Sequence, residues 1–175
     1  MTLRRSGKII RDRMASMPQH SFKIHDKIKP VTGSAINWGH PLKHNSPCLF
    51  IGSCFSEVIA MKLKDLKFPA LTNPAGIIFD PISISKCLHR VVSGHRYTES
   101  DIFTDSLQPD VYHSWDHHSS FSSVLKHDLV NRMNRHIREA LEQVKRAEAM
   151  FITLGTATVH CLRENDSVVA NCHKR

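Results

Sequence analysis

The sequence predicts an α/β domain built on a mostly parallel sheet. Two short apolar runs, at residues 48–51 and 150–154, are each followed directly by a glycine, as buried strands of a parallel sheet often are. Segments with the apolar period of amphipathic helices lie between these runs. Because strands alternate with helices, we expect the helices to pack on the faces of the sheet.

The first predicted strand and the first predicted helix flank Ser53. The strand of residues 48–51 ends at Gly52. Residues 56–68 then set a polar face opposite an apolar stripe that consists of Ile59, Leu63 and Leu66. The pattern predicts a strand, a turn at Ser53, and a helix that opens just after it.

Two more helices are predicted further along the chain. Asp80 followed by Pro81 is typical of a helix N-cap and a first-turn proline, and Gly94 marks the end of that helix. Segment 122–149 repeats apolar residues at three- and four-residue steps and predicts the longest helix.

The remaining segments are a loop and two strands. Residues 94–121 show no clean period and are expected to form a long functional loop or a small strand pair. The run at 150–154 predicts a strand, and residues 168–170, which follow a turn-like stretch, predict another.

Most of the positive charge lies in residues 1–47. The chain has 175 residues and a net charge of +8. This segment contains nine lysines and arginines but only two acidic residues, Asp12 and Asp26. Prolines and glycines interrupt the segment, so we expect a basic, irregular N-terminal arm and lead-in at 1–47, followed by an α/β domain at 48–175. Because that domain is nearly neutral, a solvated arm is favoured over the two alternatives, an arm that binds nucleic acid and a targeting segment.

Composition bears on metal sites, location and membranes. The five cysteines include no CxxC pair, which indicates neither a disulfide framework nor a cysteine zinc site. We therefore expect reduced thiols in a cytoplasmic protein, with no metal and no cofactor. No apolar run approaches the roughly 20 residues needed to span a bilayer, so no membrane span is expected.

Ser53 has the local setting of a nucleophile. A serine hydroxyl needs a base to take its proton and amide donors to receive the charge that forms on the attacked carbonyl. A turn at the end of a strand places Ser53 at the carboxyl edge of the sheet, with the Cys54 amide near a helix N-terminus. Gly52 gives the backbone room to turn. The alternative is that Ser53 only caps the helix, and the Cys54 side chain is expected to pack rather than react.

The string Gly52-Ser53-Cys54-Phe55 is followed by four further characteristic segments, at residues 73–84, 114–122, 152–157 and 168–174. In this order the segments resemble the GSCFA domain family, and the likeness runs from about Cys48 to the last residue. That family is related to SGNH or GDSL-like hydrolases. The resemblance therefore implies a three-layer α/β/α fold and a serine nucleophile.

The resemblance also implies roles for single residues. Ser53 matches the nucleophile, and the backbone amides of Cys54 and Gly76 would form the oxyanion hole. Gly155 stands where the third motif begins, but Thr156-Ala157-Thr158 lacks the expected asparagine. We expect the substitute for that asparagine to be one of two later residues, Asn171 or His173.

The sequence also differs from SGNH-type enzymes at its carboxyl end, where those enzymes carry the general base. SGNH-type enzymes place an Asp-x-x-His motif near that end, whereas this chain stops at Arg175, so the domain is expected to be incomplete there. His117 and His118 are the internal candidates for the base. Their alternative role is that of surface or substrate-contacting histidines.

Two functions follow from the resemblance. The first is a serine-dependent ester hydrolase or acyltransferase that acts on a small ester, with an O-acylated carbohydrate as a candidate substrate. The second is a non-catalytic binding domain or truncated remnant that lacks the Asp-x-x-His base.

Overall fold

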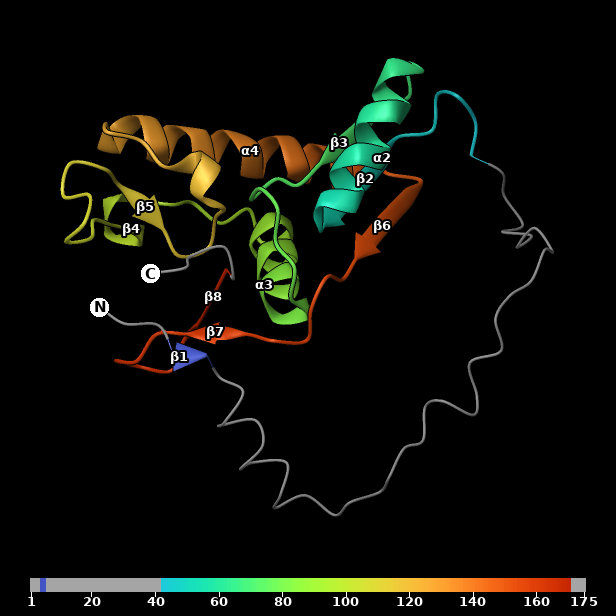
Figure 1. The fold of residues 1–175 in the computed structure, drawn as a ribbon. Helices are drawn as coiled ribbons and strands as arrows, with labels where there is room; N and C mark the ends of the chain where they lie inside the picture. The colour runs from blue at the N-terminus through green and yellow to red at the C-terminus, as the bar shows by residue number, and fades with distance from the viewer. Residues whose placement is uncertain (1–3, 6–41, 171–175) are drawn as a thin grey trace, which may run out of the picture.

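The computed structural model, which describes residues 4–5 and 42–170, contains a three-stranded parallel sheet. Strand β2 (Cys48–Gly52) is the middle strand, with β3 (Ala70–Thr72) on one side and β6 (Ala149–Thr153) on the other (Figure 1). All three strands point the same way, so their carboxyl ends meet at one edge. The predicted α/β class and parallel sheet are confirmed, but β3 was not predicted because three residues carry too little pattern.

Helix α2 (Cys54–Asp65) follows β2 directly. It begins two residues earlier than predicted, because Ser53 already adopts the extended backbone of an N-cap. It also ends earlier than the predicted residue 68. Lys67 has a positive φ of 66°, and Pro69 disfavours helical backbone at the residue before it.

The other two helices in the described part of the chain are α3 (Pro81–Val92) and α4 (Lys126–Arg146). Asp80 caps α3 as predicted, since its side chain accepts a hydrogen bond from the Ser83 amide. Helix α4 starts four residues later than predicted. The reason is that Ser123 exchanges two backbone hydrogen bonds with Tyr112, which keeps the chain extended there.

Side chains of β2 alternate between two hydrophobic clusters. Cys48 and Phe50 pack with Ala60 of α2, whereas Ile51 belongs to the larger cluster with α3 and α4. Gln143 holds α4 against the sheet. Its Nε2 donates to two backbone carbonyls, those of Cys48 and Pro69, at 2.9 Å each. Helix α4 is thus attached to the start of β2 and to the residue before β3.

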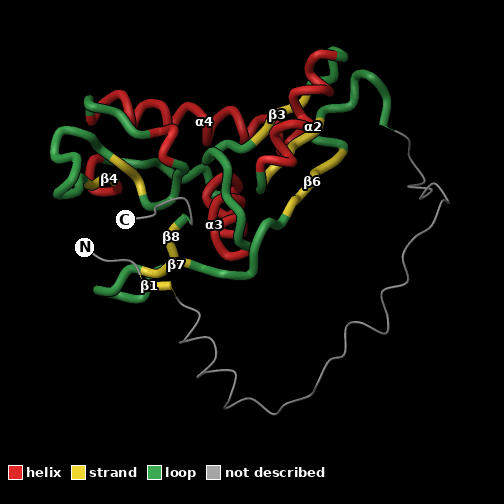
Figure 2. Tube along the Cα trace, in the orientation of Figure 1, coloured by secondary structure: helices red, strands yellow, loops and turns green. Residues whose placement is uncertain are grey.

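Two antiparallel ladders stand apart from the parallel sheet. Strands β4 (Ile102–Phe103) and β5 (His113–Ser114) form the small strand pair predicted within residues 94–121, which otherwise contain many loops (Figure 2). Strand β7 (His160–Cys161) pairs with β8 (Val168–Val169) and with β1 (Arg4–Arg5). The strand predicted at 168–170 is therefore present, but it lies outside the parallel sheet. Residues 4–5 are a strand within the segment that was expected to be irregular.

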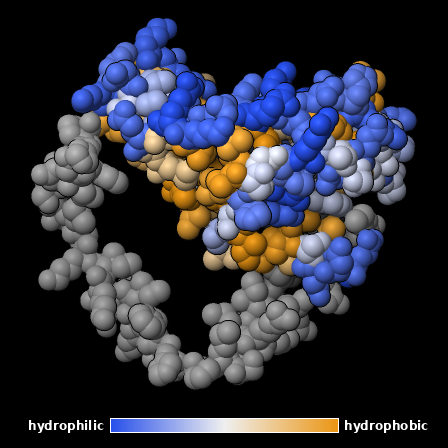
Figure 3. Space-filling view, turned by 180° about the vertical axis from the view of Figure 1, so that it is seen from behind, coloured by the Kyte–Doolittle hydropathy of each residue, from blue (hydrophilic) through white to orange (hydrophobic). Residues whose placement is uncertain are grey.

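Strand β6 is an edge of the parallel sheet and leaves apolar side chains in contact with solvent. Met150 and Ile152 of β6 are 42% and 49% exposed, and Leu154, directly after the strand, is 61% exposed. Seen from behind, the molecule has a broad apolar area bordered by polar surface (Figure 3). None of the helices within residues 42–170 is both long and apolar enough to cross a bilayer.

Candidate active site

The turn between β2 and α2 depends on Gly52. This residue has a φ of +130°, and a Cβ atom placed on it would lie 2.1 Å from the carbonyl oxygen of Thr153. Glycine is the residue that reaches this backbone conformation without strain. The close approach of β6 therefore requires glycine at the end of β2, and the next residue, Ser53, is held at the carboxyl edge of the sheet.

Ser53 is bonded to the neighbouring strand β6. Its Oγ shares a hydrogen bond of 2.8 Å with Oγ1 of Thr153, and its amide donates to the same hydroxyl at 3.0 Å. Ser56 Oγ also lies 2.8 Å from Thr153 Oγ1, so three hydroxyl groups meet at this point. Ser53 occupies the N-cap position of α2, but its side chain makes no capping hydrogen bond. Its hydroxyl is directed to the strand edge instead.

The Cys54 amide is one of the two expected oxyanion donors. Cys54 is the first residue of α2, and its amide meets no acceptor among residues 42–170. Unpaired amides at a helix N-terminus stabilise negative charge. The Cys54 side chain is exposed rather than packed in the core. The Cys54 amide, at the start of α2, is therefore available to accept negative charge from an oxygen atom.

Gly76, the other expected donor, lies in the loop after β3. Its amide donates to the carbonyl of Asn73 at 2.8 Å, so it must exchange that acceptor to bind an oxyanion. The same Asn73 accepts from the Gly52 amide through Oδ1 at 2.9 Å, which joins the loop to the Ser53 turn. Within the described residues, Nδ2 of Asn73 is buried without a hydrogen-bond partner. A buried amide of this kind is a further potential donor beside the turn.

His118 is adjacent to the Gly76 loop. Its amide donates to the carbonyl of Ala75 at 2.8 Å, and a Cβ atom on Gly76 would lie 2.4 Å from the His118 Cβ. Nδ1 of His118 accepts from the Ser120 amide at 3.1 Å, which places the proton of the neutral ring on Nε2. The structure therefore brings His118 to the loop that carries one expected oxyanion donor.

His117 has different surroundings. It is 1% exposed, its Nδ1 lies 3.0 Å from Ser114 Oγ, and its ring makes an edge contact with Tyr97 at a centroid distance of 4.9 Å. These contacts place the imidazole in the core next to Phe121. Of the two histidine candidates, His118 is the one that packs against the Gly76 loop.

Gly155 joins the end of β6 to the loop before α3. Its amide donates to the carbonyl of Phe79 at 2.9 Å, and a Cβ atom there would lie 2.7 Å from a ring carbon of the same residue. The predicted third motif is therefore adjacent to the second one in space. Asn171 and His173, the expected substitutes for the missing asparagine, lie outside the described residues.

Thr153 is a site residue that sequence reasoning missed. It pairs with Gly52 in the parallel register and carries its hydroxyl to Ser53. The signal that could have found it is positional. Parallel strands end at one edge of a sheet, so a polar residue at the end of the second apolar run is a candidate partner for Ser53. Asn73 follows β3 at the same edge and could have been found in the same way.

No group of three or more histidine, cysteine, aspartate or glutamate side chains within the described residues is arranged to hold a metal ion. The site described above consists of hydroxyls, amides and one imidazole. Its geometry suits nucleophilic attack by a hydroxyl and the binding of a developing negative charge by N–H groups.

Comparison with known families agrees with these features. The model of the GSCFA family matches residues 47–175, which is most of the chain. No curated protein and no solved structure matched the chain. The family match includes the Ser53 turn, the loop after β3 and the end of β6, and the chain therefore belongs to the GSCFA family.

Proposed function

We propose that this GSCFA-family chain is a serine-dependent ester hydrolase or acyltransferase of the SGNH type, with Ser53 as the nucleophile. The observation that carries the proposal is the direction of the Ser53 hydroxyl. It sits at the turn from strand to helix, leaves the helix uncapped, and bonds to Thr153 at the carboxyl edge of the sheet. We extend the proposal to a three-layer SGNH-like fold, since β2 contributes side chains to clusters on α2 and on α3 with α4.

In the proposed reaction, Ser53 Oγ attacks the acyl carbon of the ester and its proton passes to a histidine. The negative charge on the carbonyl oxygen is bound by the amides of Cys54 and Gly76. The alcohol leaves with the proton, and water or an acceptor hydroxyl then attacks the acyl-enzyme. His118 is the histidine that we assign to the base, and its Nε2 must come within hydrogen-bond reach of Ser53 Oγ, whose side-chain partner among the described residues is Thr153. To act through Nε2 it must shift its proton to Nδ1, which requires release of the Ser120 amide.

The substrate class and the location belong to the same proposal. An O-acylated carbohydrate is the substrate that the family resemblance favours, and it is carried here as an analogy. We also propose a cytoplasmic location, because the four cysteines in the described part of the chain are free thiols.

A non-catalytic binding or remnant domain is the second candidate, and one observation favours it. Among the described residues, the side-chain partner of Ser53 Oγ is the Thr153 hydroxyl rather than a histidine or a carboxylate. Within residues 42–170, Ser53 therefore has no base within hydrogen-bond reach. This candidate predicts a folded chain that binds a ligand without turning it over.

A fluorophosphonate probe, which reacts with activated serines, separates the two candidates. We expect labelling of the wild-type chain, loss of labelling in Ser53→Ala, and retention in Ser56→Ala. Ser56 is a matched control because its hydroxyl also bonds to Thr153. Labelling that persists in Ser53→Ala contradicts the role of Ser53. A folded chain that takes up no probe supports the non-catalytic alternative.

A further inference from the structure

A row of exposed apolar side chains runs along β6 and begins beside the Ser53 turn. The row, called the β6 strip below, consists of Met150, Ile152 and Leu154, all of which are exposed. Alternate residues of an extended chain face the same side of a sheet, so these side chains form one line. Because strand residues rise roughly 3.3 Å each, the line is about 13 Å long.

The β6 strip is exposed because the helices cover the middle strand and leave its neighbour open. Ile152 pairs in register with Ile51 of β2, so the two side chains lie on one face of the sheet. Ile51 is fully buried in the cluster that it forms with α3 and α4, whereas Ile152 is 49% exposed. The same apolar face is therefore covered over β2 and open over β6.

The strip is continuous with the serine site. Leu154 directly follows Thr153, and Thr153 Oγ1 lies 2.8 Å from Ser53 Oγ. The Ser53 hydroxyl is thus bonded to the strand that carries the strip. An acyl carbon within reach of this hydroxyl is close to the Leu154 end of the strip.

The segments that build this edge of the sheet carry no charged side chain. None of residues 48–56, 69–79 and 149–159 is a lysine, arginine, aspartate, glutamate or histidine, although 23% of the chain is charged. Asp80, which follows the second segment, is fully buried where it caps α3. A charged ligand finds no counter-ion on the strip, whereas an apolar chain removes exposed apolar area from water.

Helix α2 also has exposed apolar residues, but charged residues lie among them. Val58 and Met61 are 50% and 57% exposed. Glu57 directly precedes Val58, and Lys62 directly follows Met61. Of the two apolar surfaces that start near Ser53, the β6 strip is therefore the better match for an uncharged chain.

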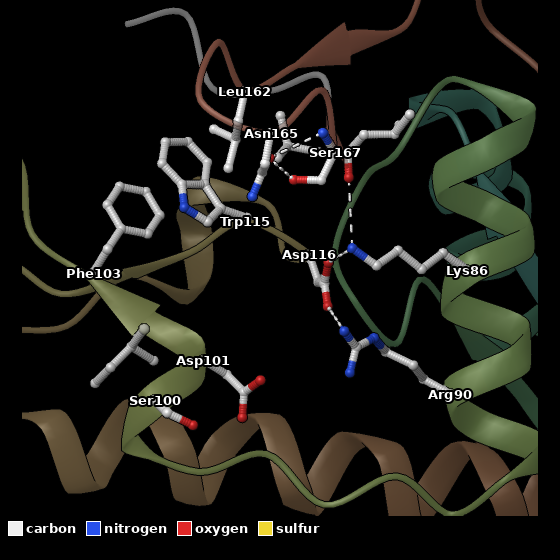
Figure 4. Close-up of a pocket in the computed structure, with 13 residues that line it drawn as sticks. Lys86, Arg90, Ser100, Asp101, Phe103, Trp115, Asp116, Leu162, Asn165 and Ser167 are labelled. Atoms are coloured by element: carbon white, nitrogen blue, oxygen red, sulfur yellow. Dashed lines mark hydrogen bonds and ion pairs between the residues drawn. The ribbon is translucent and has the colours of Figure 1, made fainter. Parts of the chain in front are cut away.

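A cavity of about 340 Å³ elsewhere in the molecule has the opposite character (Figure 4). Figure 4 shows Asp116 between Lys86 and Arg90, and it forms an ion pair with each of them. Ser53 does not line this cavity. The cavity is thus polar and does not offer an apolar chain a place next to the serine.

We propose that the β6 strip binds the acyl chain of the ester that Ser53 attacks, and that this acyl group is a medium or long aliphatic chain. The ester carbonyl lies at Ser53, and the chain lies along Leu154, Ile152 and Met150. The inference deepens the proposed function by naming the acyl class, and in that link it rests on the proposed function. It concerns the acyl portion alone, so the alcohol portion can still be a carbohydrate.

The test uses the full chain as a Ser53→Ala variant, so that binding is measured without turnover. Three probes are titrated by ligand-observed NMR: octanamide, acetamide, and an octanamide that carries a carboxylate at the far end of its chain. We expect octanamide to bind at least about tenfold more tightly than acetamide, because each further CH₂ group buries apolar area. The terminal carboxylate should remove most of this gain, since the strip offers it no counter-ion.

Two variants locate the bound chain. Ile152→Thr keeps a β-branched residue in the strand, and Leu154→Ser changes a residue just outside it. Each should weaken octanamide binding by about threefold or more and leave acetamide binding unchanged. Val58→Ser is the matched control, because it removes an equally exposed apolar side chain from α2. Its affinity for octanamide should equal that of the parent, and melting temperatures confirm that all variants are folded.

Three results would overturn the proposal. The first is octanamide binding no tighter than acetamide binding. The second is a preference for octanamide that is unchanged in both Ile152→Thr and Leu154→Ser. The third is a chain that sediments as a dimer, becomes monomeric in Ile152→Thr and binds no octanamide, which would assign the strip to a second copy.

The acyl strip and the serine chemistry can fail separately. Octanamide binding by Ser53→Ala, together with no fluorophosphonate labelling of the unsubstituted chain, would retain the strip and reject the reaction. Labelling of Ser53 without any preference for octanamide would do the reverse. If both hold, an octyl fluorophosphonate should label Ser53 at least about tenfold faster than an ethyl one.

Discussion

Thr153 Oγ1 lies 2.8 Å from Ser53 Oγ, although 100 positions in the sequence separate the two residues. They meet because β2 and β6 are parallel neighbours in which Gly52 pairs with Thr153. The candidate nucleophile is therefore oriented by the adjacent strand rather than by the helix that it precedes. Residue 153 controls both the position of this serine and part of the stability of the turn.

Thr153→Val should destabilise the chain. Valine keeps the shape of threonine but removes the hydroxyl that contacts Ser53 and Ser56. Loss of these buried hydrogen bonds should lower the free energy of unfolding by about 1–3 kcal/mol. A chain of this size should then melt about 2–4 °C lower for each kcal/mol. Thermal unfolding followed by circular dichroism measures the change, with Thr153→Ser as the control that keeps the hydroxyl. Equal melting temperatures for the two variants would show that the hydroxyl contributes nothing.

Gly52→Ala should be far more damaging than Gly94→Ala. Both glycines have a positive φ, of 130° and 61°. A Cβ atom on Gly52 would lie 2.1 Å from a backbone oxygen, whereas a Cβ atom on Gly94 would meet a side-chain carbon of Leu141 at an ordinary 3.7 Å. We expect a loss of more than about 3 kcal/mol, or failure to fold, for Gly52→Ala. For Gly94→Ala we expect about 1 kcal/mol. Chemical denaturation compares them, and similar losses would contradict the close approach of Thr153.

The serine turn was predictable from sequence because its signals are local. An apolar run, a glycine and an amphipathic stretch place Ser53 between β2 and α2, and Asp80 marks the start of α3. The partner of Ser53 was not predictable in the same way. The end of the second apolar run marks Thr153 as a candidate, but the contact itself depends on strand order and register, which the local pattern does not fix.

The two adjacent histidines also show the difference between what the local sequence predicts and what tertiary contacts decide. His117 and His118 are neighbours in the sequence, yet one ring packs in the core beside Tyr97 and the other residue packs on Gly76. They are the same residue type at consecutive positions, so only their tertiary packing distinguishes them. Strand β3 was missed for a related reason, since it is short and gains its order from pairing with β2.

The cysteines should differ widely in reactivity. Burial raises the pKa of the Cys87 thiol to about 12, with Asp116 adding to the effect, and burial also raises the pKa of Cys48. Both thiols stay protonated at pH 8 and are inaccessible, whereas Cys54 is exposed. We expect iodoacetamide to modify Cys54 much faster than the other two, as measured by peptide mass mapping. Modification of Cys87 at the rate of Cys54 would contradict its burial. In Cys54→Ser the fast modification of this peptide should disappear.

Stability should fall as the pH drops from about 7 to about 5. Burial lowers the pKa of His113 and of His136 below the ordinary 6.5, so the unfolded chain binds protons that the folded chain excludes. The stabilisation is present above the ordinary pKa and is lost as the pH falls through the lowered one. The urea midpoint measured across this range should decline less steeply in His113→Asn. Substitution of the exposed His89 by asparagine is the control. A slope in His113→Asn equal to that of the wild type would contradict the role of His113.

The pairing of β2 with β6 has a consequence for how the chain acquires its structure. During synthesis, the middle strand of the sheet is complete about 100 residues before its neighbour β6 emerges. Contacts between such distant segments form slowly, because a long loop must close first. Until β6 arrives, Ser53 lacks Thr153, and Phe50 lacks the ring of Phe151 that stacks on it at a centroid distance of 4.5 Å. The Ser53 turn is therefore among the last parts of the domain to reach its final geometry, and a nascent chain that ends before residue 149 cannot contain it.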